Sequence, residues 1–467
     1  MNPIDLTGIG NDTICAVSTP QGRGGIAVIR VSGPQALDFV GQHWQGKPVD
    51  GMTSHTVHLG HLTDTAGEVL DQAVLTIYRA PNSFTGEDVV ELACHGSTWI
   101  QQQVVQTLID TGCRHAMAGE FTRRAFANGR MDLSQAEAVA DVIEAQSRAA
   151  HHVAMSQMRG RYSDELKTLR DKLLHFTALI ELELDFSEED VTFANRNEVT
   201  ALAQDIHHLI GRLADSYRDG NAIKGGVPVA IVGQTNAGKS TLLNALLHDD
   251  RALVSDIHGT TRDTIEDSVV MGGTLFRFID TAGLRQSTDT VEQMGIERSW
   301  QALDKATIVM WVIDITRTDN ILDMAQDILA HCQGKHLIVV LNKTDLATPD
   351  DAANQLKHIL PDGTPVMAIS AKREHDVEVL SECIITSAAL PQVDSDTVIV
   401  TNARHYQALT RARDAIGRAI DGLNNGLSGD LLDQDIRECL HWLGEITGEI
   451  TTDNILGEIF AHFCVGK

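Results

Sequence analysis

The sequence predicts a multidomain chain: an N-terminal α+β domain, then a helical domain that carries an inserted α/β domain with a doubly wound, mostly parallel sheet. Three observations predict this. Short β-branched runs bounded by Gly and Pro fill residues 14–118, Gly and Pro become rare over 129–221, and strands alternate with helical intervals over 225–385. The expected boundaries are 1–128 for the first domain, 129–224 plus 390–467 for the helical domain, and 225–389 for the insertion.

Composition agrees with several folded domains. The chain has 467 residues, and at about 150 residues per domain we expect about three domains. Hydrophobic residues make up 43% and charged residues 22%, which are ordinary globular proportions that exclude global disorder. Lys and Arg number 37 against 64 Asp and Glu, a formal net charge of −27. This charge argues against nonspecific coating of nucleic acid, although a local basic patch is compatible with it.

The cysteines and the apolar runs indicate the compartment. Seven cysteines are widely separated and form no CxxC pair, which favours reduced thiols over a disulfide framework or a zinc site. The first residues lack the positive and apolar regions of a secretory signal. No stretch approaches the roughly 20 consecutive apolar residues that span a bilayer. We therefore expect a soluble, cytoplasmic protein with no membrane partner.

The first two domains are predicted from their local patterns. Strands are expected within 24–33, 73–78 and 89–92. Asp132 followed by Gln135 resembles a capping box at the start of a long helix. Helical stripes with apolar residues three or four positions apart follow at Leu166, Leu169, Leu173, Phe176 and Ile180, and again at Leu409, Ile416, Ile420 and Leu423. A turn over 422–429 separates the last two helices.

Helical sequence lies both before and after the α/β segment. Because the termini of a domain usually lie close together, this order favours insertion of the α/β domain into one helical domain. Two separate helical domains are the alternative. The strands expected in the insertion are 227–232, 275–279, 308–313, 337–341 and 366–369.

A glycine-rich loop follows the first of these strands. Residues 233–240 read GQTNAGKS and precede an apolar helical segment, which is the context of a P-loop. Its backbone N–H groups and the helix N-terminus bind phosphate, Lys239 reaches the β- and γ-phosphates, and the Ser240 hydroxyl binds Mg²⁺. The nucleotide-binding residues expected here are Asn236, Ala237, Gly238, Lys239, Ser240 and Thr241.

Three further motifs end later strands. The first is formed by Asp280, Thr281, Ala282 and Gly283. In it, the Asp280 carboxylate is expected to hold the metal through water, and the Gly283 N–H to contact the γ-phosphate. Guanine is selected by Asn342, Lys343, Thr344 and Asp345, where the Asp345 carboxylate accepts hydrogen bonds from guanine N1 and N2. Ser370, Ala371 and Lys372 offer a backbone N–H to guanine O6. All four motifs end strands at the edge where doubly wound sheets bind ligands.

This order of motifs resembles the small GTPase superfamily in its translation-factor-like branch. Residues 258–263 (HGTTRD), which include His258, Gly259, Thr260 and Thr261, then look like switch I, with Thr261 as the ligand of Mg²⁺ and γ-phosphate. The residue after Gly283 is Leu284, so the glutamine that orients water in many GTPases is missing. Hydrolysis without this glutamine has three explanations. Arg285 acts as an arginine finger in cis, or Arg285 is solvated and hydrolysis is slow without a partner protein. The third explanation comes from the family described next.

Longer strings resemble the MnmE (TrmE) family of tRNA-modification GTPases over nearly the whole chain. They are 22–25 (GRGG), 30–33 (RVSG), 81–88 (PNSFTGED), 119–126 (GEFTRRAF) and 463–467 (FCVGK). The resemblance implies an N-terminal folate-binding and dimerisation domain, and a P-loop G domain inserted into a helical domain. The G domains of a homodimer meet across their nucleotides, and K⁺ replaces the arginine finger.

The resemblance also assigns residues. Glu292 is the water-orienting catalytic residue, beside Lys239 and Thr261, and the K⁺ ligands are Asn236, Ser255, Ile257 and Thr260. Asp256 belongs to the same nucleotide-binding loop. Thr235 stands where the family usually has Pro, a change that removes no phosphate-binding donor.

A folate site is implied by the same resemblance. Glu91 suits the amide and amino edge of the pterin, and Arg30, Arg130 and Lys467 suit the anionic tail. The family needs the cysteine at Cys464 for modification, although an inert thiol is the alternative. The ending CVGK fits a prenylation signal badly.

The expected function is a GTPase that dimerises and installs a 5-carboxymethylaminomethyl or 5-aminomethyl group on the wobble uridine of tRNA. A 5-formyl- or methylene-tetrahydrofolate supplies the carbon, and an FAD-dependent partner of the MnmG (GidA) type joins it in a heterotetramer. A GTPase of ribosome assembly would carry a basic RNA-binding appendage, and a GTP-regulated transporter would carry a membrane span; the sequence shows neither feature.

Overall fold

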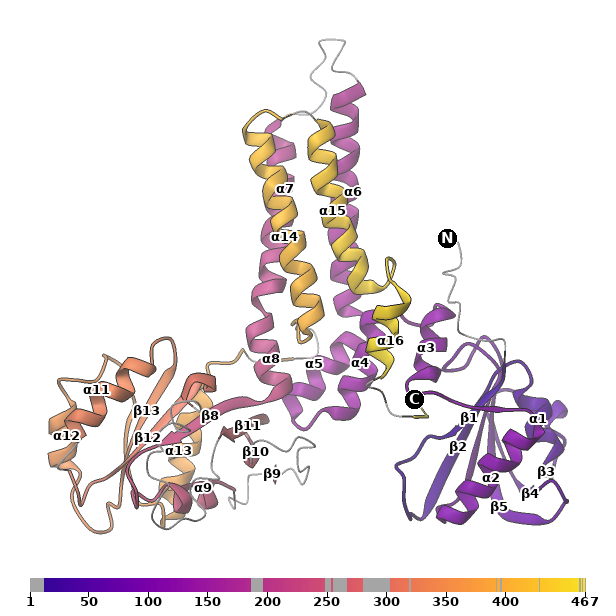
Figure 1. Ribbon diagram of the computed structural model, residues 1–467, viewed down its shortest axis with the longest axis horizontal. Helices are drawn as coiled ribbons and strands as arrows, with labels where there is room; N and C mark the ends of the chain where they lie inside the picture. The colour runs from indigo at the N-terminus through magenta and orange to yellow at the C-terminus, as the bar shows by residue number, and fades with distance from the viewer. Residues whose placement is uncertain are drawn as a thin grey trace. The chain divides into compact units, whose positions relative to one another are not determined.

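The computed structural model describes most of the chain (Figure 1). The described residues are 12–185, 196–247, 253–254, 267–279, 303–318, 321–391, 393–394, 397–427, 429–461, 463 and 465–466. They form two compact units. The first contains residues up to 140, 157–203 and 414–467, and the second contains 141–156 and 204–413.

The first unit begins with a seven-stranded sheet in the order β3-β4-β5-β6-β2-β1-β7. All its pairs are antiparallel except β1 with β7. The strands are β1 (Ile14–Val17), β2 (Ile26–Ser32), β3 (Trp44–Gln45), β4 (Thr56–Thr63), β5 (Val69–Tyr78), β6 (Val89–His95) and β7 (Arg114–His115). A short helix, η1 (Val49–Gly51), lies between β3 and β4.

Helices α1 (Ala36–Gln42) and α2 (Thr98–Thr111) cover one face of this sheet (Figure 1). Their apolar side chains share a core with alternate strand residues such as Ile29, Leu75 and Leu92. The intervening residues point to the opposite face because side chains alternate along a strand. We call that surface the open face; it carries Arg30 and Glu91, which are cross-strand partners, and the exposed side chains Val57 and Leu59.

The helices that follow confirm the predicted starts and stripes. Helix α3 (Glu120–Ala127) precedes α4 (Leu133–Glu144), where the capping box predicted at Asp132 and Gln135 is complete. The Gln135 N–H donates to Asp132 Oδ1 at 2.9 Å, and the Asp132 N–H donates to Gln135 Oε1 at 3.0 Å. The whole first stripe, Leu166 to Ile180, is buried in α6 (Arg161–Asp185).

Helix α6 packs beside α15 (Gly429–Thr447), although more than 240 residues separate the two in sequence (Figure 1). Arg170 on α6 forms an ion pair with Glu449 just after α15. Helix α16 (Asp453–Ala461) closes the unit, because Leu456 and Phe460 bury against Phe126 and Leu133. None of the described helices is long and apolar enough to cross a membrane.

In the second unit, helical segments from both sides of the α/β domain also meet. The helices are α5 (Arg148–Met158), α7 (Arg196–Asp215), α8 (Tyr217–Gly225) and α14 (Ala403–Asn424), with α7 and α14 each contributing to both units. The Val400 N–H donates to Ser216 Oγ at 3.1 Å, and the Ser156 hydroxyl donates to the Thr397 carbonyl at 3.2 Å. Of the predicted α14 stripe, Leu409, Ile416 and Leu423 are buried.

The α/β domain has a seven-stranded sheet in the order β14-β13-β12-β8-β11-β10-β9. Five strands are parallel, and β10 and β9 form an antiparallel edge. The strands are β8 (Val227–Val232), β9 (Leu253–Val254), β10 (Asp267–Met271), β11 (Thr274–Ile279), β12 (Ile308–Asp314), β13 (His336–Asn342) and β14 (Val366–Ile369). The five strands predicted from sequence are therefore confirmed to within one residue.

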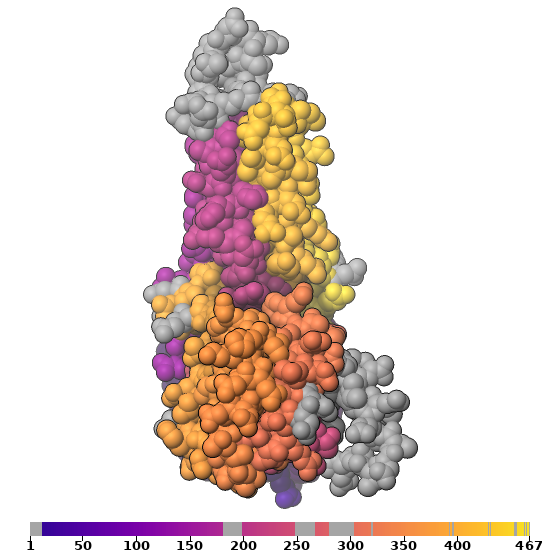
Figure 2. Space-filling view, turned by 90° about the vertical axis from the view of Figure 1, so that its left-hand side faces the viewer, coloured from indigo at the N-terminus to yellow at the C-terminus, as the bar shows by residue number. Residues whose placement is uncertain are grey.

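Helices cover both faces of this sheet, so the predicted double winding is confirmed for the described residues. Helices α9 (Lys239–Leu247) and α13 (Glu374–Ser387) bury apolar residues on one face, and α11 (Ile321–His331) and α12 (Asp350–Leu356) on the other. Orange atoms in Figure 2 show part of the outer surface of this domain.

The β10–β11 hairpin is bonded to helix α5. The Ala149 N–H donates to the Gly273 carbonyl at 3.0 Å, and the neighbouring Ala150 N–H is capped by the Ser147 hydroxyl at 3.1 Å. The first turn of a helix leaves N–H groups without partners inside the helix. In helix α5, the Ala149 N–H finds its partner in the turn between β10 and β11.

Candidate nucleotide and ligand sites

The glycine-rich loop joins β8 to α9 with a backbone that only certain residues allow. Gly233 and Gly238 have φ of 150° and 95°. A Cβ on Gly233 would lie 2.1 Å from the Val312 carbonyl oxygen, so glycine is required by contact as well as by conformation. Asn236 also has a positive φ, 66°, which asparagine tolerates better than most residues.

Lys239 is the first residue of α9, and its side chain folds back over the loop. The ammonium group donates to the carbonyl oxygens of Gly233 and Gln234, each at 2.7 Å. Burial lowers the pKa of this group below its ordinary value of 10.5. A desolvated cation at a helix N-terminus is suited to an anion such as phosphate.

The Asn342 side chain bridges two loops at the carboxyl edge of the sheet. Its amide donates to the Ala237 carbonyl at 2.8 Å, and its oxygen accepts the Ala371 N–H at 3.0 Å. Asn342 is 2% exposed. The predicted motifs at 233–240, 342–345 and 370–372 are thereby brought together.

Asp345 is held from two sides by the third of these motifs. Its Oδ1 accepts the Ser370 hydroxyl at 2.9 Å, and Lys372 donates to its Oδ2 at 3.2 Å. These two bonds hold the pKa of Asp345 below its usual range. The Ser370 N–H is in turn bonded to Asp376 Oδ2 at 2.8 Å, which fixes the loop to the start of α13. The carboxylate is partly exposed and charged at neutral pH, so both of its oxygens act as acceptors.

Sequence reasoning missed the partner of Lys343. Its ammonium donates to Asp314 Oδ2 at 2.6 Å, at the end of β12, and Lys343 has a φ of 75°. Burial alone would raise the pKa of Asp314, but the bonds from Lys343 and Thr316 outweigh it and lower the pKa. One sequence signal was available for this pair. Asp314 directly follows the predicted apolar strand 308–313, and Lys343 follows the predicted strand 337–341.

Several predicted site residues lie outside the described residues, so their positions stay predictions. They are Ser255, Asp256, Ile257, His258, Gly259, Thr260, Thr261, Asp280, Thr281, Ala282, Gly283, Glu292, Cys464 and Lys467.

A second cluster forms on the open face of the N-terminal sheet. Arg30 Nε and a terminal nitrogen donate to Glu91 Oε1 at 2.9 and 2.8 Å, and the Tyr78 hydroxyl approaches Glu91 Oε2 at 3.5 Å. The guanidinium lies over the Phe84 and Phe121 rings, 5.5 and 5.6 Å from their centroids. The Arg30 and Glu91 side chains are 20% and 24% exposed, so a ligand can reach both.

The C-terminal segment reaches this cluster. The Gly466 carbonyl accepts the Ser18 hydroxyl at 3.0 Å and an Arg30 nitrogen at 3.5 Å, and Val465 forms a β-bridge with Ala118. Arg130 instead lies against the loop over residues 81–88: a Cβ on Gly86 would be 3.3 Å from Arg130 Cγ. Arg30, Glu91 and the C-terminal segment are therefore together, and the contact given for Arg130 is with the 81–88 loop.

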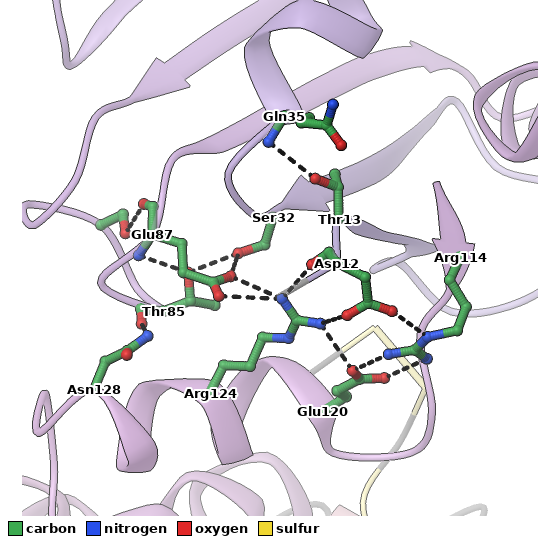
Figure 3. Close-up of polar contacts among 11 residues, drawn as sticks. Asp12, Thr13, Ser32, Gln35, Thr85, Glu87, Arg114, Glu120, Arg124 and Asn128 are labelled. Carbon is green, nitrogen blue, oxygen red and sulfur yellow. Dashed lines mark hydrogen bonds and ion pairs between the residues drawn. The ribbon is translucent and has the colours of Figure 1, made fainter. Parts of the chain in front are cut away.

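A buried charge network lies beneath the same loop (Figure 3). Arg124 on α3 is fully buried and donates to the carboxylates of Asp12, Glu87 and Glu120. Arg114 pairs with Asp12 and Glu120 on the other side. Burial would raise the pKa of Asp12 and Glu120, but the hydrogen bonds from the arginines outweigh it and lower both. Sequence reasoning missed this network.

The fold and these sites define a multidomain protein with a P-loop α/β domain. The model for the MnmE helical domain matches residues 133–464, and that for the GTP-binding protein TrmE N-terminus matches 13–130. A "tRNA modification GTPase MnmE" of Bacteroides thetaiotaomicron is 52% identical over 98% of this chain and 99% of its own, and one of Bacteroides fragilis is 53% identical over the same shares. The chain therefore belongs to the MnmE (TrmE) family.

Among solved structures, the G domain of the T. maritima FeoB iron transporter is similar to part of the chain. It shares 27% identity over 35% of this chain and 98% of its own length, with a TM-score of 0.26.

Proposed function

We propose that this protein is a GTPase that acts in tRNA modification, as the names of its relatives state for those proteins. The observation that carries the proposal is the Asn342 bridge, because it sets the P-loop and the base-recognition loop at one edge of the sheet. The Asp345 carboxylate, held by Ser370 and Lys372, supplies two acceptors for the N1 and N2 donors of guanine. Adenine lacks these donors and is rejected.

The triphosphate site uses the loop and the start of α9. Lys239 binds the β- and γ-phosphates in exchange for the two carbonyl oxygens that it now contacts. Ser240 and Thr261 hold Mg²⁺, and switch I with Asp280 to Gly283 completes the shell around the γ-phosphate. These roles rest on the motifs and on family membership.

Hydrolysis is proposed to depend on K⁺. The ion stabilises the charge that develops between the phosphates, with Asn236, Ser255, Ile257 and Thr260 as ligands. These ligands are assigned by family membership; Asn236 is the one of them that the structure describes. Glu292 orients the attacking water.

The cluster on the open face is proposed to hold a tetrahydrofolate. Glu91 suits the amide and amino edge of the pterin, and Arg30, which contacts two aromatic rings, is bonded to it. The residues fit this ligand because a carboxylate and a guanidinium are both partly exposed there. Arg130 and Lys467 bind the anionic tail, and Cys464 is the thiol that modification requires. The folate supplies a one-carbon unit for the wobble uridine.

Assembly is proposed to occur on the same sheet. Ile26, Val57 and Leu59 are 69%, 63% and 67% exposed, and Val57 and Leu59 lie on the open face. Such apolar exposure supports a homodimer formed through the N-terminal domain. An FAD-dependent partner of the MnmG type then joins a cytoplasmic heterotetramer that binds tRNA. Packing of α6 against α15 supports a G domain inserted between parts of one helical domain.

Calorimetry on the purified full chain tests nucleotide choice. We expect GTP to bind and ATP not to bind; equal binding of both, or of neither, contradicts the proposal. Turnover in K⁺ buffer against Na⁺ buffer tests the ion, with many-fold faster hydrolysis expected in K⁺. Glu292→Ala is expected to keep GTP affinity and lose hydrolysis.

Nucleoside analysis of tRNA tests the biological role. Cells that lack the protein are expected to lose the modified wobble uridine, and the gene for the intact chain to restore it. An unchanged nucleoside profile would remove the tRNA part of the proposal and leave the GTPase part standing.

A further inference from the structure

The loop over residues 81–88 is fixed from below by buried polar contacts. Glu87 Oε1 and Oε2 accept bonds from an Arg124 terminal nitrogen at 3.1 and 3.2 Å. Glu87 Oε2 also accepts the Ser32 hydroxyl at 2.7 Å. The Asn128 amide donates to the Thr85 carbonyl at 2.7 Å (Figure 3). The loop is therefore tied to α3 through Arg124, to the C-cap of α3 through Asn128, and to β2 through Ser32.

The same loop places an aromatic ring on Arg30. Phe84 is three residues before Glu87, and its ring lies 5.5 Å from the Arg30 guanidinium. Phe121, the second ring that Arg30 contacts, is on α3 three residues before Arg124. Both rings that Arg30 contacts thus belong to segments that Arg124 joins.

The energetics make this arrangement unlike an ordinary surface ion pair. Arg124 is 0% exposed, whereas the Glu87 side chain is 21% exposed. A fully buried guanidinium persists only if carboxylates compensate it, so the Glu87 bond is costly to break. Ser32, which also bonds Glu87, is two residues after Arg30 and points to the same face of β2.

We infer that Arg124 and Glu87 are positioning residues for the folate site: they fix the 81–88 loop so that Phe84 and Phe121 hold the Arg30 guanidinium against Glu91. Neither residue touches the ligand. The inference rests on the proposed folate function and adds the residues that keep its recognition group in place.

Binding of 5-formyl-tetrahydrofolate to the full chain, measured by calorimetry, tests the inference. Glu87→Gln keeps the shape of the side chain, removes one of the three carboxylate charges that compensate Arg124, and replaces one of the two oxygens that Arg124 contacts by a donor. We expect its folate affinity to fall at least tenfold while its GTP affinity stays unchanged. Phe84→Leu is expected to lower folate affinity similarly, without disturbing the buried network.

Arg114→Gln is the matched control. Arg114 belongs to the same network through Asp12 and Glu120, and its described bonds do not include Glu87. Both variants are expected to lower the melting temperature, but Arg114→Gln should keep folate affinity within twofold of the unchanged protein. If both variants lost folate affinity in proportion to the decrease in their melting temperatures, the network would have only a general structural role. That result would overturn the inference.

Two further outcomes separate this inference from the proposed function. If the unchanged protein binds folate and Glu87→Gln binds it equally well, the positioning role is wrong and the folate site stands. If the unchanged protein binds GTP and no folate, the folate part of the proposed function fails, and the inference fails with it.

Discussion

Asn342 donates a hydrogen bond to the carbonyl oxygen of Ala237, 105 residues earlier in the chain, at 2.8 Å. The same side chain accepts the Ala371 N–H, so one buried amide serves two loops. A Cβ on Gly238 would lie 2.2 Å from the donor nitrogen, which shows how closely the P-loop approaches it.

Asn342→Ala is expected to lower the free energy of unfolding and nucleotide affinity together. It leaves the Ala237 carbonyl and the Ala371 N–H without their partner, and a buried unsatisfied group costs about 1–3 kcal/mol. Urea unfolding and GTP calorimetry measure the two effects. Asn354→Ala, at an exposed position of α12, is the control and should change neither. Full GTP affinity in Asn342→Ala would show that the bridge does not organise the loops.

Asp345→Asn is expected to exchange guanine preference for xanthine preference. The amide replaces one acceptor by a donor, and xanthine carries a carbonyl oxygen where guanine carries the N2 amino group. Competition between GTP and XTP measures the switch. Asp362→Asn, an exposed change in the same domain, should leave GTP preferred. Equally weak binding of GTP and XTP by Asp345→Asn would contradict the switch in base preference and indicate a damaged loop.

Asp314→Asn is expected to destabilise the protein at neutral pH. The pKa of Asp314 is lowered in the folded protein, so its charge stabilises the fold above the ordinary value of 3.8 and this contribution is lost as the pH falls through the lower folded value. With Asp314 5% exposed, we expect a loss of about 1–3 kcal/mol at pH 7. Urea unfolding at pH 7 and at pH 3 should show the smaller difference at pH 3. An equal difference at both would contradict the assignment.

Cys94 and Cys439 are expected to resist alkylation in the folded protein. Burial, followed by the charge of Asp71, raises the pKa of Cys94 to about 11. Burial, followed by Glu438, raises that of Cys439 to about 12. Since only the thiolate reacts, about one Cys94 in a thousand is reactive at pH 8. Iodoacetamide labelling with peptide mass spectrometry should find both unmodified until urea is added; rapid labelling without urea would contradict their burial.

The sequence predicted the α/β domain well because of how parallel strands are buried. Strands covered on both faces read as continuous β-branched runs, and β12 is buried at every position. The antiparallel strand β10 and the strand β4 were missed because polar residues and glycine interrupt their apolar runs: Asp267 and Ser268 begin β10, and His58, Gly60 and His61 lie within β4. On β4, exposed and buried positions alternate along much of the strand.

The site was predictable in its motifs and unpredictable in its connections. The loops at 233–240, 342–345 and 370–372 follow predicted strands, so topology alone brings them to one edge. The partners of Lys343 and Arg124 come from distant segments, and no local pattern distinguishes a buried Arg124 from a solvated helix residue. Burial of a charge depends on what the rest of the chain supplies.

The hydrogen bond from the Ala149 N–H to the Gly273 carbonyl couples the start of helix α5 to the β10–β11 hairpin of the α/β sheet. Residues 225–389 produced alone would leave that carbonyl to solvent. In deuterated water, the first amides of α5 are therefore expected to exchange at the pace of the β10–β11 hairpin.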